Sequence, residues 1–168
     1  MKFAVNLLEQ FQNKFLIMNK KEQYELLVRQ AASLADGETD LIANMANISS
    51  LLHFAMGFWW TGFYLVKEGQ LVLGPYQGPL ACTRIGYGKG VCGSAWKASE
   101  TIVVEDVEKF PGHIACSSES RSEIVVPIFK RSSEKKEILG VLDIDSRDLA
   151  TFDSVDKEYL EKIVELLG

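Results

Sequence analysis

The sequence predicts an α+β fold in which helices flank an antiparallel β-sheet. Amphipathic helical spacing occurs near both ends of the chain and encloses segments rich in aromatic and β-branched residues. Several of these strand-like segments are joined by short polar turns, which connect antiparallel strands. This order of elements is typical of an α+β layout with helices on one or both sides of the sheet. The length fits a single domain, which we expect to cover residues 1–168.

Helical spacing first appears in residues 3–17, which predict an amphipathic helix. Met18 is an alternative start that would make residues 1–17 an N-terminal helical extension, and the sequence leaves this choice open. Residues 20–35 predict the next helix, whose inner face carries Tyr24, Leu27, Val28, Ala31 and Leu34. Thr39 is the expected N-cap of a further helix from about Asp40 to Met56. Its inward residues are Leu41, Met45, Ile48 and Leu52.

Strand signals occur in two pairs. The segment WWTGFYLVK is aromatic and β-branched, Glu68-Gly69 is a turn, and LVLGPYQG returns, so a hairpin is expected. Gly74-Pro75 in the returning segment indicates a sheet edge or a bulge. The second pair, EIVVPIFK and EILGVLDID, is separated by the polar turn RSSEKK. After it, an amphipathic helix is expected, with an apolar face formed by Val155, Tyr159, Leu160 and Ile163.

The region between the two hairpins, residues 79–121, is punctuated by glycines and is poor in regular structure. GSAWKAS predicts a short helix, TIVVED predicts a short strand, and KFPGHIACSSESRS predicts a long loop. Long loops in compact domains usually carry function. We therefore expect functional residues in this region.

Charge and hydropathy exclude several classes of protein. The formal net charge of −5 argues against a nucleic-acid-binding protein and against a partner of anionic membrane surfaces. No apolar run approaches the roughly 20 residues of a membrane span. Polar residues interrupt the apolar start and no cleavage site follows, so no signal peptide is expected. We therefore expect a cytoplasmic protein whose cysteines are kept reduced.

All three cysteines, Cys82, Cys92 and Cys116, lie in the loop-rich region. Their usual role in a cytoplasmic protein is that of small buried apolar side chains. Loops can also bring them together in a reactive site. A zinc site formed by Cys82, Cys92, His113 and Cys116 is a further alternative, although only His113 and Cys116 have the usual ligand spacing.

Acidic residues form a second candidate site on the last predicted strand. Asp143 and Asp145 alternate along LGVLDIDS, so both face one side of the sheet while Leu142 and Ile144 face the other. Glu123 opens the neighbouring strand and is expected to join them. The carboxylates belong either to a solvated end of the sheet or to a site for a cationic ligand, because carboxylates are rarely buried unpaired.

Aromatic residues follow the same alternation on the first strand. Trp60, Gly62 and Tyr64 share one face of this strand. They form either part of the aromatic core or a wall that faces a ligand. The second interpretation gains weight only where the carboxylates border the aromatic rings.

Nearly the whole chain, residues 20–167, resembles the free methionine-(R)-sulfoxide reductases, which are GAF-domain enzymes. The resemblance is carried by IGYGKGVCGSAWKASETIVVEDVEKFPGHIACSSESRSEIVVPI and by EILGVLDIDS. Within these, GVCG, HIAC and SEIVVP are specific, as is the WTGFYL strand. Other GAF domains match loosely, at the glycine turn and at GVLDIDS. The N-terminal extension and the long RSSEKK turn depart from the family pattern.

The resemblance implies a GAF fold with a six-stranded antiparallel sheet flanked by helices. It also implies roles for the three thiols. Cys116 in HIAC corresponds to the nucleophile, which becomes a sulfenic acid. Cys82 in ACTRI corresponds to the main resolving cysteine, which forms a disulfide with the nucleophile. Cys92 in GVCG corresponds to a third cysteine that can also form a disulfide.

The resemblance further implies how the substrate is held. Glu123, Asp143 and Asp145 correspond to carboxylates around the substrate's amino group, and Trp60 to an aromatic residue that packs on its methyl group. Tyr64 is expected beside Trp60 in the substrate-binding wall.

The resemblance finally implies the partners of the reaction. The substrate is free L-methionine-(R)-sulfoxide, the external reductant is thioredoxin, and no metal or organic cofactor is required. The family also implies a homodimer. The alternative function is that of a non-catalytic GAF module that binds a small ligand.

Overall fold

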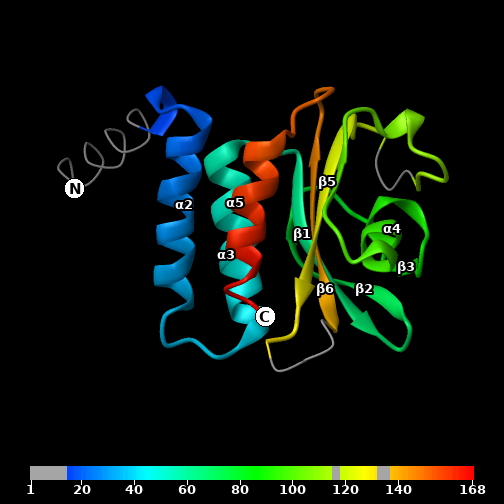
Figure 1. Cartoon of the computed structure of the whole chain (residues 1–168), viewed down its shortest axis with the longest axis horizontal. Coiled ribbons are helices and arrows are strands. Elements are labelled where there is room, and N and C mark those ends of the chain that lie inside the picture. Colours follow the sequence, from blue (N-terminus) through cyan, green and yellow to red (C-terminus); the bar gives the residue numbers. More distant parts are fainter. Residues whose placement is uncertain (1–14, 115–117, 132–136) are drawn as a thin grey trace.

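The computed structural model describes residues 15–114, 118–131 and 137–168 (Figure 1). Within these ranges, six strands form one antiparallel sheet in the order β3-β2-β1-β6-β5-β4. The strands are β1 (Trp60–Lys67), β2 (Gln70–Gln77), β3 (Arg84–Gly86), β4 (Ile102–Val104), β5 (Ser122–Phe129) and β6 (Ile138–Ser146). The helices are α2 (Lys20–Ala35), α3 (Leu41–Met56), α4 (Gly90–Ala98) and α5 (Ser154–Val164), with a 3-10 turn η1 (Val107–Lys109). The predicted α+β fold and six-stranded sheet are confirmed.

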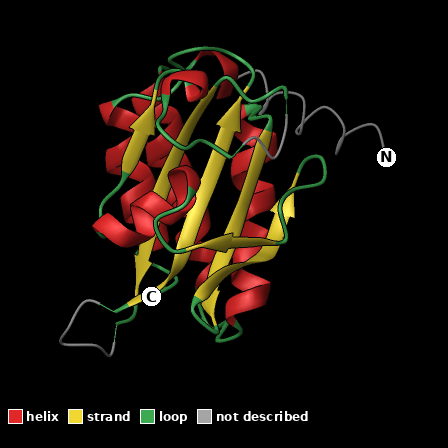
Figure 2. Cartoon of the chain, turned by 90° about the vertical axis from the view of Figure 1, so that its right-hand side faces the viewer, coloured by secondary structure: helices red, strands yellow, loops and turns green. Residues whose placement is uncertain are grey.

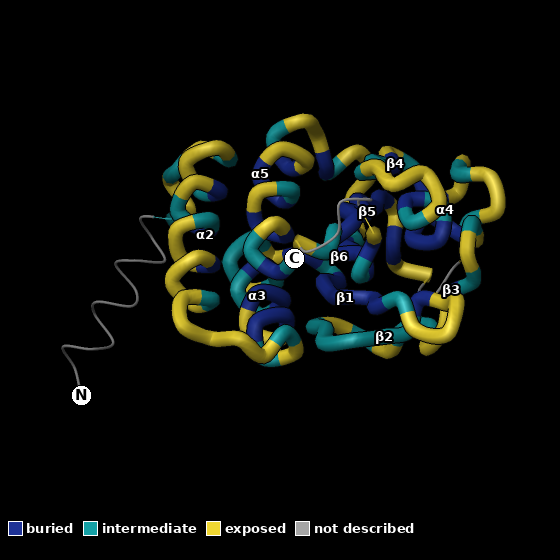
Figure 3. The backbone as a smooth tube through the Cα atoms, turned by 60° about the horizontal axis from the view of Figure 1, so that its bottom comes forward, coloured by how far each residue is buried: buried dark blue, intermediate teal, exposed yellow. Residues whose placement is uncertain are grey.

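Three helices, α2, α3 and α5, form a layer on one face of the sheet (Figure 1). The short helix α4 lies on the opposite face, in front of the strands in Figure 2. Side chains of the central strands therefore divide between two apolar clusters. Phe63 of β1 and Leu142 of β6 pack toward the three-helix layer, whereas Trp60 and Tyr64 belong to the cluster under α4. The central strands are buried on both faces and appear dark blue in Figure 3.

The helix ends follow from side-chain caps. Asn19 accepts a hydrogen bond from the backbone N–H of Glu22 at 3.0 Å, and the Glu22 carboxylate accepts one from the N–H of Asn19 at 3.0 Å. This reciprocal capping box starts α2. Asp153 and Asp156 form the same arrangement at the start of α5.

A two-residue turn sets the first hairpin. Glu68 and Gly69 have φ angles of 53° and 75°, and Lys67 pairs with Gln70 across the turn. Positive φ at both central residues is typical of a type I′ turn, whose twist matches that of the flanking strands. The turn therefore fixes which side chains of β1 face α4.

Two details of the predicted helices are wrong. The N-cap of α3 is Asp40, not Thr39, and its carboxylate accepts from the N–H of Ala43 at 2.8 Å. Asp40 lies one residue closer than Thr39 to the free N–H groups of the first turn. Its carboxylate caps them, so the helix begins at Leu41. Leu34 is 42% exposed, because α2 packs on α5 and α3 through Tyr24, Leu27 and Ala31 and turns its last leucine outward.

The bulge that Gly74-Pro75 indicated is present in the sheet. Gly62 pairs with Tyr76 and Tyr64 pairs with Leu73, so the register shifts across Gly74 and Pro75 of β2. The strand β3 has three residues, and so short a segment carries no periodic signal. The short helix begins at Gly90, before GSAWKAS. The predicted helix over residues 3–17 lies mostly outside the described residues.

None of the helices in the described ranges combines the length and the apolar character of a membrane span.

Candidate functional site

The pairing of β1, β6 and β5 places the predicted polar and aromatic residues in one row. Asp145 of β6 pairs with Trp60 of β1 on one side and with Glu123 of β5 on the other. Asp143, two residues earlier on β6, pairs with Gly62 of β1. Residues two apart on a strand share a face, so the acidic and aromatic side chains meet on the sheet face beneath α4.

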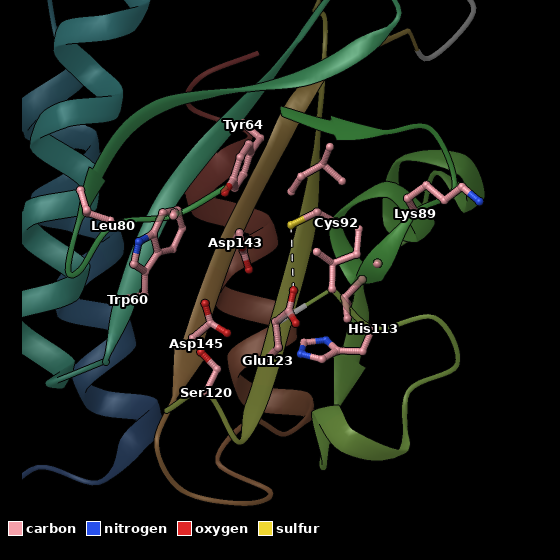
Figure 4. Close-up of a pocket in the computed structure, with 15 residues that line it drawn as sticks. Trp60, Tyr64, Leu80, Lys89, Cys92, His113, Ser120, Glu123, Asp143 and Asp145 are labelled. Atoms are coloured by element: carbon pink, nitrogen blue, oxygen red, sulfur yellow. Dashed lines mark hydrogen bonds between the residues drawn. The ribbon is translucent and has the colours of Figure 1, made fainter. Parts of the chain in front are cut away.

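These residues line a hollow of about 550 Å³, counted to its open mouth. Figure 4 shows the residues that line it as sticks. Six residues predicted for the site line it together, namely Trp60, Tyr64, Cys92, Glu123, Asp143 and Asp145. The carboxylates therefore border the aromatic rings, which favours the ligand-facing interpretation of both groups.

The three carboxylates lie close together with little solvent around them. Glu123 and Asp143 are 6% and 7% exposed, and Asp145 is half-buried. Burial raises the pKa of Asp143 to about 6. Burial and the charges of the neighbouring carboxylates raise the pKa values of Glu123 and Asp145 well above their ordinary range. Like charges at a dry site oppose each other's ionisation, so the three carboxyl groups do not all ionise together near neutral pH.

The described basic side chains of the pocket, Lys89 and His113, form no ion pair with these carboxylates. None of the ion pairs within the described part of the chain includes Glu123, Asp143 or Asp145. Lys89 lines the pocket, but its ammonium group points away from the acidic side chains in Figure 4. One buried oxygen, Oδ1 of Asp143, has no hydrogen-bond partner in the described ranges. The site is therefore complementary to a positively charged group of a ligand.

Cys92 lies in the first turn of α4 and is a buried free thiol. It donates a hydrogen bond to Oε1 of Glu123, with 3.9 Å between sulfur and oxygen. Burial, together with the charges of Asp143 and Glu123, raises the pKa of this thiol well above its ordinary value. Cys92 is therefore protonated at neutral pH and is a poor nucleophile in this environment.

The aromatic wall is held in one orientation. The Trp60 indole N–H donates to the carbonyl of Pro79 at 3.1 Å, and its ring stacks on Tyr76 with centroids 5.4 Å apart. A Cβ atom on Gly62 would lie 2.4 Å from the Trp60 ring, and one on Gly78 would lie 2.8 Å from it. Both glycines therefore make room for the indole, and any larger side chain would displace it.

Cys82 lies at the edge of the pocket, next to Leu80 and Ala81, which line it. The Tyr64 hydroxyl donates to the Cys82 carbonyl at 3.0 Å, and burial raises the pKa of this tyrosine. Cys82 is disulfide-bonded, in contrast to Cys92. Tyr64 therefore ties the backbone of Cys82 to the aromatic wall.

Cys116 lies outside the described residues. On either side of it in the sequence, Ile114 and Ser120 line the hollow, together with His113. Burial lowers the pKa of His113, and its Nδ1 has no hydrogen-bond partner among the described residues.

Some features of the site were not predicted from the sequence. Ser120 is buried and forms a hydrogen bond with the Asp145 side chain. This hydrogen bond opposes the rise in the pKa of Asp145. Leu80 lines the pocket although it is 85% exposed. Neither residue lies on a periodic element, so spacing carried no signal for them. The structure also groups Cys92 with Glu123 and Asp143 instead of with the other cysteines and His113, as far as the described residues extend.

Comparison with known proteins finds GAF-domain proteins over most of the chain. Residues 38–168 match the GAF domain family. The GAF domain-containing protein A of Dictyostelium discoideum is 54% identical over 150 residues, which cover 89% of this chain and 92% of that protein. The free methionine-R-sulfoxide reductase of Saccharomyces cerevisiae is 46% identical over 159 residues, covering 90% and 87%. The crystal structure of free methionine-R-sulfoxide reductase from Neisseria meningitidis, in complex with its substrate, superposes with a TM-score of 0.85 at 49% identity, covering 89% of each chain.

Proposed function

The chain belongs to the free methionine-R-sulfoxide reductase family of GAF-domain proteins, and we propose from this premise how its pocket reduces free methionine-(R)-sulfoxide to methionine. The observation that carries the proposal is the juxtaposition of three carboxylates with an aromatic wall in one hollow. The carboxylates recognise the charged end of a free amino acid, and the aromatic wall receives its sulfur end. Both ends of the substrate are then held without a cofactor.

The acidic side chains hold the substrate's ammonium group. Asp143 supplies a buried oxygen that has no hydrogen-bond partner among the described residues. A charge-assisted hydrogen bond to such an oxygen is worth about 1.5–3 kcal/mol. A methionine residue inside a protein has no ammonium group, so the pocket selects the free amino acid.

The aromatic wall receives the S-methyl group. Trp60 and Tyr64 stack with centroids 6.0 Å apart and border the carboxylates on β6. Their apolar faces take up the methyl group, which leaves the sulfoxide oxygen directed toward the acidic groups. A protonated carboxyl of Glu123 or Asp143, each with a raised pKa, donates the proton that this oxygen needs.

The thiols carry the electrons. The Cys116 thiolate attacks the sulfoxide sulfur, the oxygen passes to Cys116 as a sulfenic acid, and methionine leaves. Cys82 condenses with the sulfenic acid, which forms a disulfide and releases water. A dithiol protein such as thioredoxin then exchanges with this disulfide and restores both thiols. Cys92 is a reserve thiol, because its environment keeps it protonated. The cycle suits the reducing cytoplasm, where such a reductant is available.

The test is consumption of free L-methionine-(R)-sulfoxide by the purified protein in a coupled thioredoxin assay, with N-acetylmethionine sulfoxide as the matched substrate that lacks the ammonium group. We expect the free amino acid to be consumed and the acetylated compound to be a poor substrate. Cys116→Ser should abolish turnover even with dithiothreitol. Cys82→Ser should release about one methionine per chain and then stop with thioredoxin, because resolution is lost.

Two outcomes contradict this proposal. Near-normal thioredoxin-linked activity of the Cys116→Ser variant would show that Cys116 is not the nucleophile. Tight binding of the sulfoxide without any consumption would identify the alternative, a GAF module that binds a small ligand without chemistry.

A further inference from the structure

A thiol and two carboxyl groups form a compact cluster at the base of the pocket. Single ligand atoms from Cys92, Glu123 and Asp143 all lie within 4.8 Å of one another, and all three residues are buried. The Cys92 sulfur and Oε1 of Glu123 are 3.9 Å apart. The three side chains come from two adjacent strands and from α4, which packs on both of them. The secondary structure therefore holds the cluster together from both sides.

The cluster forms no ion pair within the described part of the chain. Oδ1 of Asp143 is buried and receives no hydrogen bond from a described residue, although the side chain lines the pocket and points into it (Figure 4). A buried carboxylate oxygen without a partner is costly, and a bound cation is one of the few ways to satisfy it. This unpartnered oxygen distinguishes the cluster from surface acidic residues, which water satisfies.

We propose that Cys92, Glu123 and Asp143 bind a thiophilic divalent cation, Zn²⁺ being the expected ion, and that the bound ion closes the pocket to substrate. One thiolate and two carboxylates match the ligand preference of zinc, whereas Mg²⁺ and Ca²⁺ prefer oxygen ligands alone. The ion displaces the Cys92 proton to solvent and forms a bond to the resulting thiolate, so no oxidant or reductant is involved.

The distances are close to those of a metal site. Tetrahedral zinc, with bonds of about 2.1 Å to oxygen and 2.3 Å to sulfur, separates its ligand atoms by about 3.4–3.6 Å. Since the ligand atoms lie within 4.8 Å of one another, the distances between them must contract by at most about 1.4 Å to reach this geometry, which rotations of the Glu123 and Asp143 side chains can provide. Three protein ligands leave a fourth position, which faces the hollow and takes water.

Inhibition rests on the proposed function, because the ion occupies the place assigned to the substrate's ammonium group. Both cations need Asp143, so they exclude each other. Zinc would therefore act as a competitive inhibitor, and chelators would raise activity instead of removing it. This site differs from a structural zinc site, which holds the fold together and is lost with it.

The direct test uses Cd²⁺ as a probe of the metal–thiolate bond. In the variant C82S/C116S, Cys92 is the remaining thiol, and Cd²⁺ should produce the ultraviolet absorption of a cadmium–thiolate bond at one ion per chain. Adding Cys92→Ser should abolish this absorption, and adding Asp143→Asn should weaken Cd²⁺ affinity at least about tenfold. Glu100→Gln, which removes an exposed carboxylate away from the pocket, is the matched control and should have no effect.

The outcomes separate this inference from the proposed function. No absorption in C82S/C116S, or a Cd²⁺ affinity that Asp143→Asn leaves unchanged, overturns the metal site. Cadmium binding that methionine sulfoxide fails to displace overturns competition at a shared site. Metal binding in a protein that consumes no sulfoxide rejects the proposed function and keeps the metal site.

A second measurement covers the case in which the double variant does not fold. Zinc X-ray absorption of the unmutated, reduced protein should report one sulfur and two or three oxygen ligands. Two or more sulfur ligands would assign zinc to the other cysteines and would overturn the site proposed here.

Discussion

Asp143→Asn separates a ligand-binding role of the carboxylates from a structural role. The pKa of Asp143 is raised from 3.8 to about 6, chiefly by burial. A carboxyl whose pKa is higher in the folded than in the unfolded protein favours folding while it is protonated. This contribution is fully present below pH 3.8, the ordinary value, and is lost as the pH rises through about 6. At pH 7 the ionised carboxylate therefore costs the folded state on the order of 3 kcal/mol. Asparagine removes this charge and keeps the size of the side chain.

The expected gain in stability is smaller than that cost. The buried amide of asparagine lacks some of the hydrogen-bond partners it needs, and this costs the folded state on the order of 1–2 kcal/mol. We expect a net increase of roughly 1 kcal/mol in the free energy of unfolding at pH 7, or about 2–4 °C in Tm for a domain of this size. Near pH 4 the folded carboxyl is protonated and most of the ionisation cost is gone, whereas the cost of the buried amide remains, so the gain should disappear and the variant should be no more stable than the unmutated protein.

Substrate binding should change in the opposite direction. Loss of one charge-assisted contact costs about 1.5–3 kcal/mol, which is roughly a tenfold to hundredfold rise in KM. In the unmutated enzyme KM should fall as the pH rises through about 6, because the ammonium group binds the ionised Asp143. The variant should lose this dependence.

Two assays together test this prediction: thermal unfolding at pH 4 and pH 7, and steady-state kinetics across the same range. Asp36→Asn, a change at an exposed carboxylate, is the matched control and should alter neither. A variant that is less stable at pH 7 with an unchanged KM would show that Asp143 is structural and would refute the pocket described above.

Two further substitutions test the frame around the pocket. Gly62→Ala places a Cβ atom 2.4 Å from the Trp60 ring, so the indole must move, and we expect altered indole fluorescence with a KM raised about tenfold. Asp156→Asn removes a fully buried carboxylate that accepts from Tyr24 at 2.8 Å and pairs with Lys20. Urea unfolding should show a loss of about 2–3 kcal/mol, with kcat unchanged because the pair lies in the helical layer.

Each of these has its own contrary result. An unchanged fluorescence spectrum and KM in Gly62→Ala would mean that the indole is not held by the glycine. A change in kcat of Asp156→Asn, measured where the variant is fully folded, would connect the helical layer to the pocket and contradict their separation by the sheet.

Periodicity predicted the elements that bury one face. The bounds of α2 came from five apolar positions and were confirmed, and the β1–β2 hairpin came from its turn residues. The elements that periodicity missed, β3 and η1, have three residues each. Such short segments form because neighbours already in place offer them hydrogen bonds, and this information lies in the tertiary structure.

The site was predictable where it lies on strands. Alternation placed Asp143 and Asp145 on one face of β6, and the pairing of β6 with β1 brought Trp60 beside them. The contact of Cys92 with Glu123 was not predictable by spacing, since it depends on how α4 packs over the sheet. The assignment of roles to the cysteines came from the family resemblance and stays a prediction, with Cys116 outside the described residues.

The number of carboxylates in the pocket has a chemical consequence. One ammonium group carries one positive charge, whereas Glu123, Asp143 and Asp145 together carry up to three negative charges. Burial raises the pKa of each, and the charges of neighbouring carboxylates raise those of Glu123 and Asp145 further. A single cation relieves only part of the repulsion among three carboxylates. One proton is therefore expected to stay on the set while the substrate is bound. Reduction of a sulfoxide needs a proton on the departing oxygen, so the carboxylates that select a free amino acid would also supply the acid for its reduction. A pocket with a single carboxylate could bind the ammonium group, but it would have no proton left to give.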